Sequence, residues 1–145
     1  MMIKAVIIEN EKHCLDSLMS DLHSYCPQVE IAGTADGVKS GIALIKRSHP
    51  AIVFLDIELA DGTGFDILEQ LASGQNNSRH FPFSVIFTTS FNQFAVKAFR
   101  FSALDYLLKP VDPDELVSAV KKFTDAGKKT QEIELNALFE RLQKN

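Results

Sequence analysis

The chain has 145 residues, of which 46% are hydrophobic, and it carries a formal net charge of -4 at pH 7. This length supports one domain with a sizeable core, and the charge provides no basic surface for binding nucleic acid through its phosphate backbone. Because the sequence contains neither a signal peptide nor the run of roughly 20 apolar residues that a membrane span needs, we expect a cytoplasmic protein.

Five short apolar runs, rich in β-branched residues, are typical of strands that are covered on both faces. In chain order they span residues 3–8, 29–35, 51–55, 83–89 and 103–108. The segments between them have helical periodicity, and Val38, Ile42 and Ile45 fall on one helix face. Strands and helices are therefore predicted to alternate along the chain.

Polar residues mark the expected starts of three helices. Asp36, Thr63 and Asp112 can each cap a helix N-terminus, and Asp112 is followed by Pro113 and Glu115 in positions typical of a first turn. The short crossovers between successive strands favour a parallel sheet with right-handed connections. We therefore predict an α/β, flavodoxin-like fold with a doubly wound, five-stranded parallel sheet, (βα)5.

The end of the chain is predicted to differ from this βα pattern. Gly127 interrupts the helical pattern, which resumes as an apolar stripe at Leu135, Leu138, Phe139 and Leu142. We expect a domain over residues 1–125, and over 126–145 a linker with an extra amphipathic C-terminal helix. Since the sequence supplies nothing to cover this stripe, we also expect the chain to be part of a longer protein.

Functional side chains follow four of the predicted strands. Glu9 and Asn10 follow the first strand, Asp56 the third, Thr89 ends the fourth, and Lys109 follows the fifth. The carboxyl ends of parallel strands meet at one edge of the sheet, where α/β folds keep their ligand sites. We therefore expect these five residues to form one site.

The residue types predict phosphoryl-transfer chemistry. Asp56 is the candidate nucleophile, because an aspartate that attacks a phosphoryl group forms an acyl phosphate. Glu9, Asn10 and Asp56 offer the oxygen ligands that Mg²⁺ prefers. Lys109 can neutralise the phosphoryl oxygens and Thr89 can donate a hydrogen bond to them. The Lys109-Pro110 step, placed just after a strand, also favours a cis peptide bond.

These residues, together with the run IFTTSFNQFAVKAFRFSALDYLLKPVDPDEL, resemble the receiver domain of bacterial two-component response regulators over residues 2–125. The run is particularly similar to receivers of LytTR-type regulators, in which the receiver precedes a DNA-binding domain. This resemblance implies that Asp56 is the phosphoacceptor and Lys109 the phosphate-binding lysine. It also implies that Thr89 and Tyr106 are the conformational switch pair and that Glu58 offers its backbone carbonyl to the metal.

Two neighbouring threonines, Thr88 and Thr89, are candidates for the hydroxyl at the site. Side chains alternate along a strand, so Thr88 and Thr89 point in opposite directions. Thr89 is followed by the small Ser90, which the resembled family requires for access of the phosphate. We therefore assign the site to Thr89.

The pair Glu9-Asn10 departs from the resembled pattern, which has two acidic residues at these positions. Asparagine keeps an oxygen ligand but removes a charge, and glutamate is one methylene longer than aspartate. We therefore expect weakened Mg²⁺ binding, for which Glu11 can compensate, and a working but slower phosphoacceptor.

The resemblance implies a sensor histidine kinase as the phosphodonor and a DNA-binding output domain outside these 145 residues. No membrane association is expected, because no apolar run is long enough for a span. Phe91, Phe94, Phe99 and Phe101 crowd the fourth predicted helix, and not all of them can face the core. They indicate either tight packing or, together with the fifth strand and helix, an apolar face for a partner or a homodimer.

Two other functions are open alternatives. A pseudo-receiver would keep the fold and bind partners without phosphorylation, because Glu9-Asn10 holds Mg²⁺ poorly. An aspartyl-phosphate phosphatase is suggested by Asp56 and the DGTG run, but Glu58 and Ala60 occupy the positions where such enzymes have an aspartate and a threonine. We therefore expect a signalling domain whose only phosphoryl transfer and hydrolysis are its own.

The cysteines and histidines predict no further site. Cys14 and Cys26 are twelve positions apart, without a second cysteine pair or histidines at a standard metal-ligand spacing. Disulfide and zinc interpretations are both disfavoured, and two reduced thiols are expected.

Overall fold

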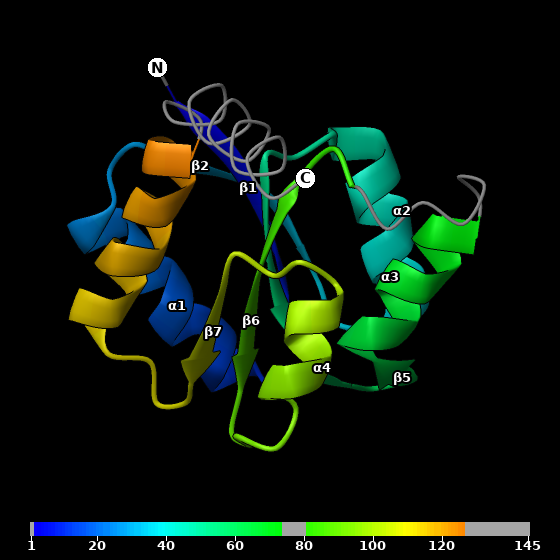
Figure 1. Ribbon diagram of the computed structural model, residues 1–145. Coiled ribbons are helices and arrows are strands. Elements are labelled where there is room, and N and C mark those ends of the chain that lie inside the picture. Colours follow the sequence, from blue (N-terminus) through cyan, green and yellow to red (C-terminus); the bar gives the residue numbers. More distant parts are fainter. Residues whose placement is uncertain (1, 74–80, 127–145) are drawn as a thin grey trace, which may run out of the picture.

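In the computed structural model, a parallel sheet lies between two layers of helices (Figure 1). Residues 2–73 and 81–126 are described. The five strands are β1 (Ile3–Ile8), β2 (Val29–Ala35), β3 (Ile52–Asp56), β6 (Ser84–Thr89) and β7 (Asp105–Leu108). Their order across the sheet is β2-β1-β3-β6-β7, and every neighbouring pair is parallel. This order, which reverses direction beside β1, confirms the doubly wound, five-stranded prediction.

Helices cover both faces of the sheet, as Figure 1 shows. One face carries α1 (Lys12–Tyr25) and a helix over residues 113–126, which lie together at the left of the view. The other face carries α2 (Val38–Ser48), α3 (Gly64–Ser73) and α4 (Ala95–Arg100). Within the described ranges, none of the helices has the length and apolarity to cross a membrane.

The sheet has a hydrophobic core on each face, which explains why the strand sequences are continuous apolar runs. In β1, Val6 and Ile8 belong to the core beneath α2 and α3, while Ala5 and Ile7 belong to the core beneath α1. Every residue of β3 is buried. Alternate side chains of one strand thus enter opposite cores, and each fully buried large aliphatic side chain contributes about 1.5–3 kcal/mol.

The start of α2 differs from the prediction that Asp36 caps it. The N-cap residue is Gly37, and the free N–H groups of Val38 and Lys39 donate to the Asp61 carboxylate at 2.5 and 3.3 Å. These bonds hold the pKa of Asp61 below its ordinary value. A residue from a distant turn therefore satisfies the helix terminus that a local side chain was expected to cap.

The other two helix starts follow the sequence prediction. The Thr63 hydroxyl accepts a hydrogen bond from the Asp66 N–H at 3.2 Å, and the Asp66 carboxylate accepts one from the Thr63 N–H at 2.9 Å. The Asp112 carboxylate accepts one from the Asp114 N–H at 2.8 Å. Thr63 and Asp112 are therefore confirmed as N-caps.

A short hairpin between β3 and α3 was not predicted. Its strands, β4 (Glu58–Leu59) and β5 (Gly62–Thr63), pair antiparallel and place Asp61 in the turn between them. The hairpin therefore positions the carboxylate that caps α2.

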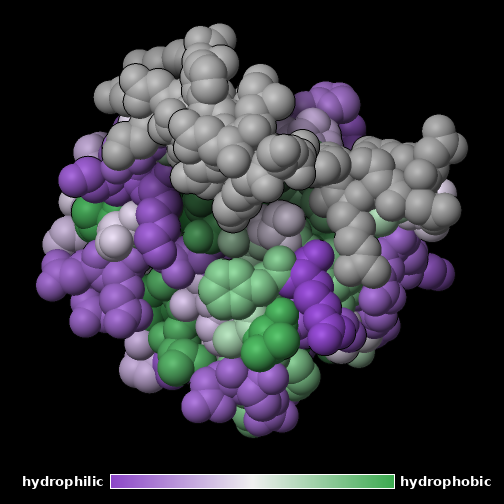
Figure 2. Space-filling model, in the orientation of Figure 1, coloured by the Kyte–Doolittle hydropathy of each residue, from purple (hydrophilic) through white to green (hydrophobic). Residues whose placement is uncertain are grey.

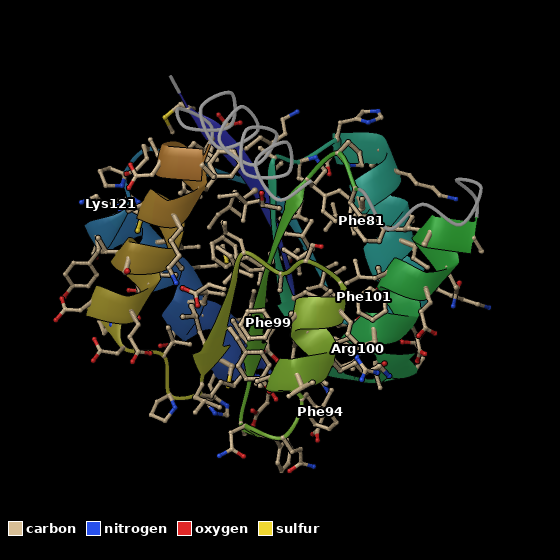
Figure 3. All side chains as sticks on the ribbon, in the orientation of Figure 1. Phe81, Phe94, Phe99, Arg100, Phe101 and Lys121 are labelled. Carbon is tan, nitrogen blue, oxygen red and sulfur yellow. The ribbon has the colours of Figure 1, made fainter. Side chains whose placement is uncertain are left out.

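Of the four phenylalanines predicted for one helix, only Phe99 lies within α4; Phe94 and Phe101 are its cap residues, and Phe91 precedes it (Figure 3). They divide between core and surface. Phe101 is 3% exposed and stacks on Phe65 with ring centroids 5.6 Å apart, while Phe99 on α4 is 78% exposed. Phe91, Val96 and Leu108 are exposed as well. We call Phe91, Val96, Phe99 and Leu108 the α4 patch; Figure 2 shows apolar side chains gathered at the front centre, over α4, beside hydrophilic ones.

The predicted extra C-terminal helix and nearly all of the predicted linker over 126–145 lie outside the described residues. The helix over residues 113–126 follows β7, completes the fifth βα unit and packs Leu116, Ala119 and Val120 into the core beneath α1.

Gly64 has no space for a side chain. A Cβ there would lie 2.5 Å from the Asp56 carbonyl oxygen and 2.9 Å from Leu55 Cγ. We expect Gly64→Ala to lower the free energy of unfolding by roughly 1–3 kcal/mol, measured by urea denaturation. Gly33→Ala is the control, because the added methyl would meet only a movable end of Leu44, 2.7 Å away. Equal losses in both variants would contradict this packing account.

Candidate functional site

The predicted site residues meet at the carboxyl edge of the sheet, which is the lower edge in Figure 1. The strand register brings Leu55 beside Ile8, Asp56 beside Thr88, and Thr89 beside Leu108. Glu9 and Lys109 directly follow β1 and β7. Parallel pairing alone therefore brings residues from four separate parts of the chain to one place.

Lys109 joins two buried carboxyl groups. Its Nζ atom lies 2.5 Å from Glu9 Oε1 and 3.2 Å from Asp56 Oδ2. The residues Glu9 and Asp56 are only 4% and 3% exposed. The Lys109 backbone N–H donates to the Thr89 carbonyl at 2.7 Å, which fixes the start of the lysine side chain, and the Lys109-Pro110 peptide is cis as expected. Because buried charges are costly when unpaired, this ion pair decides the electrostatics of the site.

Burial and the neighbouring Glu9 raise the pKa of Asp56 to about 7, although Lys109 partly opposes this shift. For Lys109, burial on its own lowers the pKa, but the hydrogen bonds and charges of Glu9 and Asp56 outweigh burial, so the net pKa is raised. One ammonium group therefore does not fully balance two adjacent carboxylates, and a further cation would favour the ionised form of Asp56.

An oxygen-rich cavity of about 170 Å³ opens beside Asp56. Its lining consists of Asn10, Glu11, Asp56, Glu58, Thr89, Ser90 and Lys109. The Glu58 N–H donates to Asp56 Oδ1 at 3.3 Å, which holds the Glu58 peptide next to the carboxylate. Carboxylate and amide oxygens are the ligands that Mg²⁺ takes, so this donor set, with its unbalanced negative charge, fits that ion.

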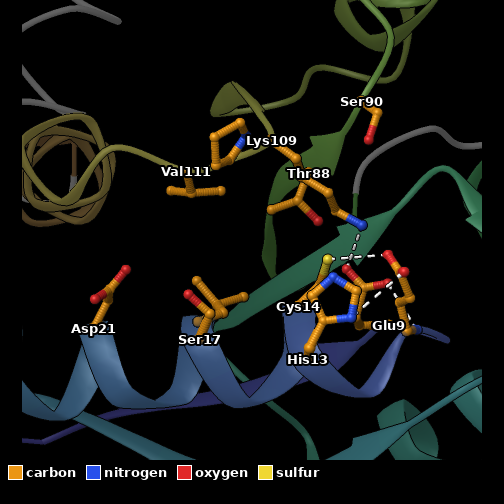
Figure 4. Close-up of a pocket in the computed structure, with 12 residues that line it drawn as sticks. Glu9, His13, Cys14, Ser17, Asp21, Thr88, Ser90, Lys109 and Val111 are labelled. Carbon is orange, nitrogen blue, oxygen red and sulfur yellow. Dashed lines mark hydrogen bonds and ion pairs between the residues drawn. The ribbon is translucent and has the colours of Figure 1, made fainter.

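The two adjacent threonines face different cavities. Thr89 shares the oxygen-rich cavity with Asp56, whereas Thr88 lines a second cavity, of about 330 Å³, beside α1 (Figure 4). This is the alternation expected along a strand. It is consistent with the choice of Thr89 over Thr88.

The backbone of Phe91 links Thr89 to Tyr106. The Phe91 N–H donates to Thr89 Oγ1 at 3.2 Å, and the Tyr106 hydroxyl donates to the Phe91 carbonyl. The Tyr106 ring lies 6.5 Å from that of Phe87, and burial raises the pKa of its hydroxyl. This connection could not be predicted from the sequence, because it is made by the backbone N–H and carbonyl of Phe91, and any residue at that position has the same carbonyl.

The fold and site define a protein class, and comparison with known proteins agrees with it. The sequence profile of the response regulator receiver domain family matches residues 5–121. The chain therefore belongs to this family. Receiver domains are signalling domains and generally bind Mg²⁺ at the phosphorylation site. The fold, the family and the two-component signalling context predicted from the sequence are therefore confirmed.

Among curated relatives, the chain is similar to sensory transduction proteins LytT. It is 38% identical to the protein of Bacillus cereus over 122 residues, which are 84% of this chain and 47% of the relative. It is 31% identical to the protein of Bacillus subtilis over 136 residues, covering 94% of this chain and 54% of the relative. The chain thus spans about half the length of these relatives, and the predicted likeness to LytTR-type receivers is confirmed.

Solved structures agree with the family. The response regulatory domain of protein mrkE from Klebsiella pneumoniae has a TM-score of 0.73 at 26% identity, with 88% of this chain and 99% of that chain covered. A DNA-binding response regulator of the LuxR family from Staphylococcus aureus gives 0.69 at 27% identity, with 84% and 98% covered.

The raised pKa of Asp56 gives a pH-dependent stability prediction. Since the pKa is higher in the folded state, the wild type loses stability as pH rises from about 4 to about 7. Asp56→Asn removes this titration, so without Mg²⁺ it should be more stable than the wild type by roughly 1–3 kcal/mol at pH 8, and by less at pH 5. Urea denaturation with a chelator present measures both values.

Asp61→Asn is the control of opposite sign, because the pKa of Asp61 is lowered by its bonds to α2. It should destabilise the protein, and more at pH 8 than at low pH. The electrostatic explanation would be contradicted if Asp56→Asn were less stable than the wild type at pH 8, or if its gain in the free energy of unfolding were the same at both pH values.

Proposed function

We propose that this chain is the phosphoacceptor switch of a two-component system, in which Asp56 accepts a phosphoryl group from a sensor histidine kinase in the cytoplasm. The observation that carries the proposal is the position of Asp56, which is paired with Lys109 and shares its cavity with Thr89. Membership of the receiver family supports it. We assign the receiver domain to residues 1–125 and a linker with a helix to 126–145.

The chemistry follows from the groups at the site. An Asp56 carboxylate oxygen attacks the phosphorus of a phosphohistidine; the new O–P bond forms as the P–N bond breaks, and the imidazole leaves with the bonding electrons. Lys109 neutralises charge on the transferred group, and the Thr89 hydroxyl donates to one of its oxygens. Mg²⁺, when held by Glu9, Asn10, Asp56 and the Glu58 carbonyl, supplies further positive charge to the phosphoryl oxygens.

The Glu9-Asn10 pair is expected to weaken Mg²⁺ binding without abolishing it. Glu9 is buried, bound to Lys109 and absent from the lining of the Asp56 cavity, whereas Asn10 lines that cavity but is uncharged. The pair therefore presents no carboxylate to the cavity unless Glu9 moves, and the exposed Glu11, which lines it, is the acidic group that can assist.

Phe91 provides a route from the phosphoryl group to the surface. When Thr89 turns to donate to a phosphoryl oxygen, its bond from the Phe91 N–H must adjust, and the Phe91 carbonyl holds the Tyr106 hydroxyl. We propose that Thr89 and Tyr106 change position together, which shifts an existing equilibrium between two conformations.

The proposed output surface is the α4 patch with the adjoining β7 and the 113–126 helix. Phe99 is 78% exposed and Val96 69% exposed, an unusual exposure for large apolar side chains on one short helix. We propose that a second copy of the chain docks here upon phosphorylation. DNA binding is proposed only for an output domain outside these residues.

A pseudo-receiver is the second candidate, since Glu9-Asn10 departs from the usual acidic pair. The ion-paired Asp56 and Lys109, and the position of Thr89 in their cavity, favour the phosphoacceptor instead.

Intact mass measurement after incubation with acetyl phosphate tests the chemistry. With Mg²⁺ the wild type should gain the mass of one phosphoryl group, and it should gain none with a chelator. Asp56→Asn is the matched control and should gain none in either condition. If the wild type also gains none after prolonged incubation, the pseudo-receiver becomes the better account.

The threonines provide a second test with an internal control. Thr89→Ala removes the hydroxyl in the Asp56 cavity and should slow phosphorylation about tenfold or more, since a hydrogen bond to a charged group contributes roughly 1.5–3 kcal/mol. Thr88→Ala, at an equally buried neighbour, should leave the rate within about threefold of the wild type. The reverse order of effects would assign the phosphoryl contact to Thr88.

A further inference from the structure

Three different metal-ligating side chains, those of Glu11, His13 and Cys14, converge at the start of α1. Figure 4 shows His13 and Cys14 on this helix; Glu11 also lines the oxygen-rich cavity beside Asp56. Glu11 is the N-cap residue of the helix, and His13 and Cys14 lie in its first turn. The Cys14 thiol donates to Glu11 Oε2 at 3.1 Å, and His13 Nδ1 lies 3.5 Å from Glu11 Oε1. One ligand atom from each residue lies within 4.8 Å of the other two.

The three side chains lie close enough together to share one cation after small rotations. In a tetrahedral zinc site with Zn–S of about 2.3 Å and Zn–N and Zn–O of about 2.0 Å, neighbouring ligand atoms lie about 3.2–3.8 Å apart. The Cys14–Glu11 contact of 3.1 Å is slightly shorter than this range and the His13–Glu11 contact of 3.5 Å lies within it, but the two contacts use different oxygens of the Glu11 carboxylate. Side-chain rotations are therefore needed to bring one atom of each residue, now within 4.8 Å of the others, around one ion. The side chains of His13 and Glu11 are 79% and 57% exposed, so a cation can reach them from solvent.

The ligand set selects a different ion from the one that fits beside Asp56. A thiolate and an imidazole prefer borderline or soft cations, whereas Mg²⁺ takes oxygen ligands. We propose that Glu11, His13 and Cys14 form a binding site for a thiophilic divalent cation of the Zn²⁺ class, with water in the fourth position. Binding releases the thiol proton, because the thiolate is the form that coordinates the metal.

The proposed site adjoins the second cavity, of about 330 Å³, which Glu11, His13 and Cys14 line together with Thr88 and Lys109. Asp56 does not line this second cavity, although Glu11 and Lys109 line both cavities. Zinc was not expected from the sequence, because Cys14 and Cys26 have no second cysteine pair and no histidines at a standard metal-ligand spacing. The Glu11 carboxylate, at the N-cap of α1, contacts both His13 and Cys14.

Titration of the reduced chain with Zn²⁺, followed by calorimetry, and with Co²⁺, followed by absorbance, tests the proposal. We expect one equivalent to bind, with a thiolate-to-cobalt charge-transfer band. Cys14→Ser should abolish the band and weaken Zn²⁺ binding at least about tenfold, and His13→Gln should weaken it comparably. A tenfold excess of Mg²⁺ should not displace the Zn²⁺.

The chain offers matched controls for the cysteine and the histidine: Cys26→Ser and His23→Gln, which leave the cluster intact, should bind like the wild type. Asp56→Asn should also keep the Zn²⁺ site while losing phosphorylation, so failure here and failure of the phosphoacceptor function are distinguishable. Absence of binding in the wild type, unchanged affinity in Cys14→Ser, or loss of binding in Asp56→Asn would each overturn the proposal.

Discussion

The Lys109 ammonium group has to balance two carboxyl groups, those of Glu9 and Asp56, which the fold buries at one edge of the sheet. This balance is incomplete, and the raised pKa of Asp56 is its direct consequence. The same imbalance explains why a divalent cation fits the neighbouring cavity: added positive charge favours the carboxylate form of Asp56, which the proposed phosphoryl transfer requires. The loss of folding stability at high pH without metal and the proposed reactivity of Asp56 with metal therefore have the same electrostatic cause.

A short series of hydrogen bonds connects the buried ion pair to the surface of the protein. The Lys109 N–H is bound to the Thr89 carbonyl, the Thr89 hydroxyl to the Phe91 N–H, and the Phe91 carbonyl to the Tyr106 hydroxyl. Phe91 is itself part of the exposed α4 patch. Asp56 is thus connected to an apolar surface through three residues, Lys109, Thr89 and Phe91. A change of charge at Asp56 could affect that surface without a large rearrangement of the sheet.

Sequence reasoning succeeded where physical rules act locally or through strand order. The strands 3–8 and 29–35 were predicted with the observed bounds, because burial on both faces requires continuous apolar runs. Glu9, Asp56 and Lys109 meet because parallel strands end at one edge. The Asp61 cap joins residues 23 positions apart, and the Glu11, His13 and Cys14 cluster depends on the conformation of an N-cap turn. Neither follows from periodicity or spacing.

The connection between the buried ion pair and the surface is tested by an amide NMR spectrum recorded with Mg²⁺, before and after addition of beryllofluoride, a stable mimic of the phosphoryl group. We expect the resonances of Asp56, Thr89, Phe91 and Tyr106 to shift together, and Asp56→Asn to abolish these shifts. Shifts confined to Asp56 and its chain neighbours, with Phe91 and Tyr106 unchanged, would contradict the proposed connection between the buried ion pair and the surface.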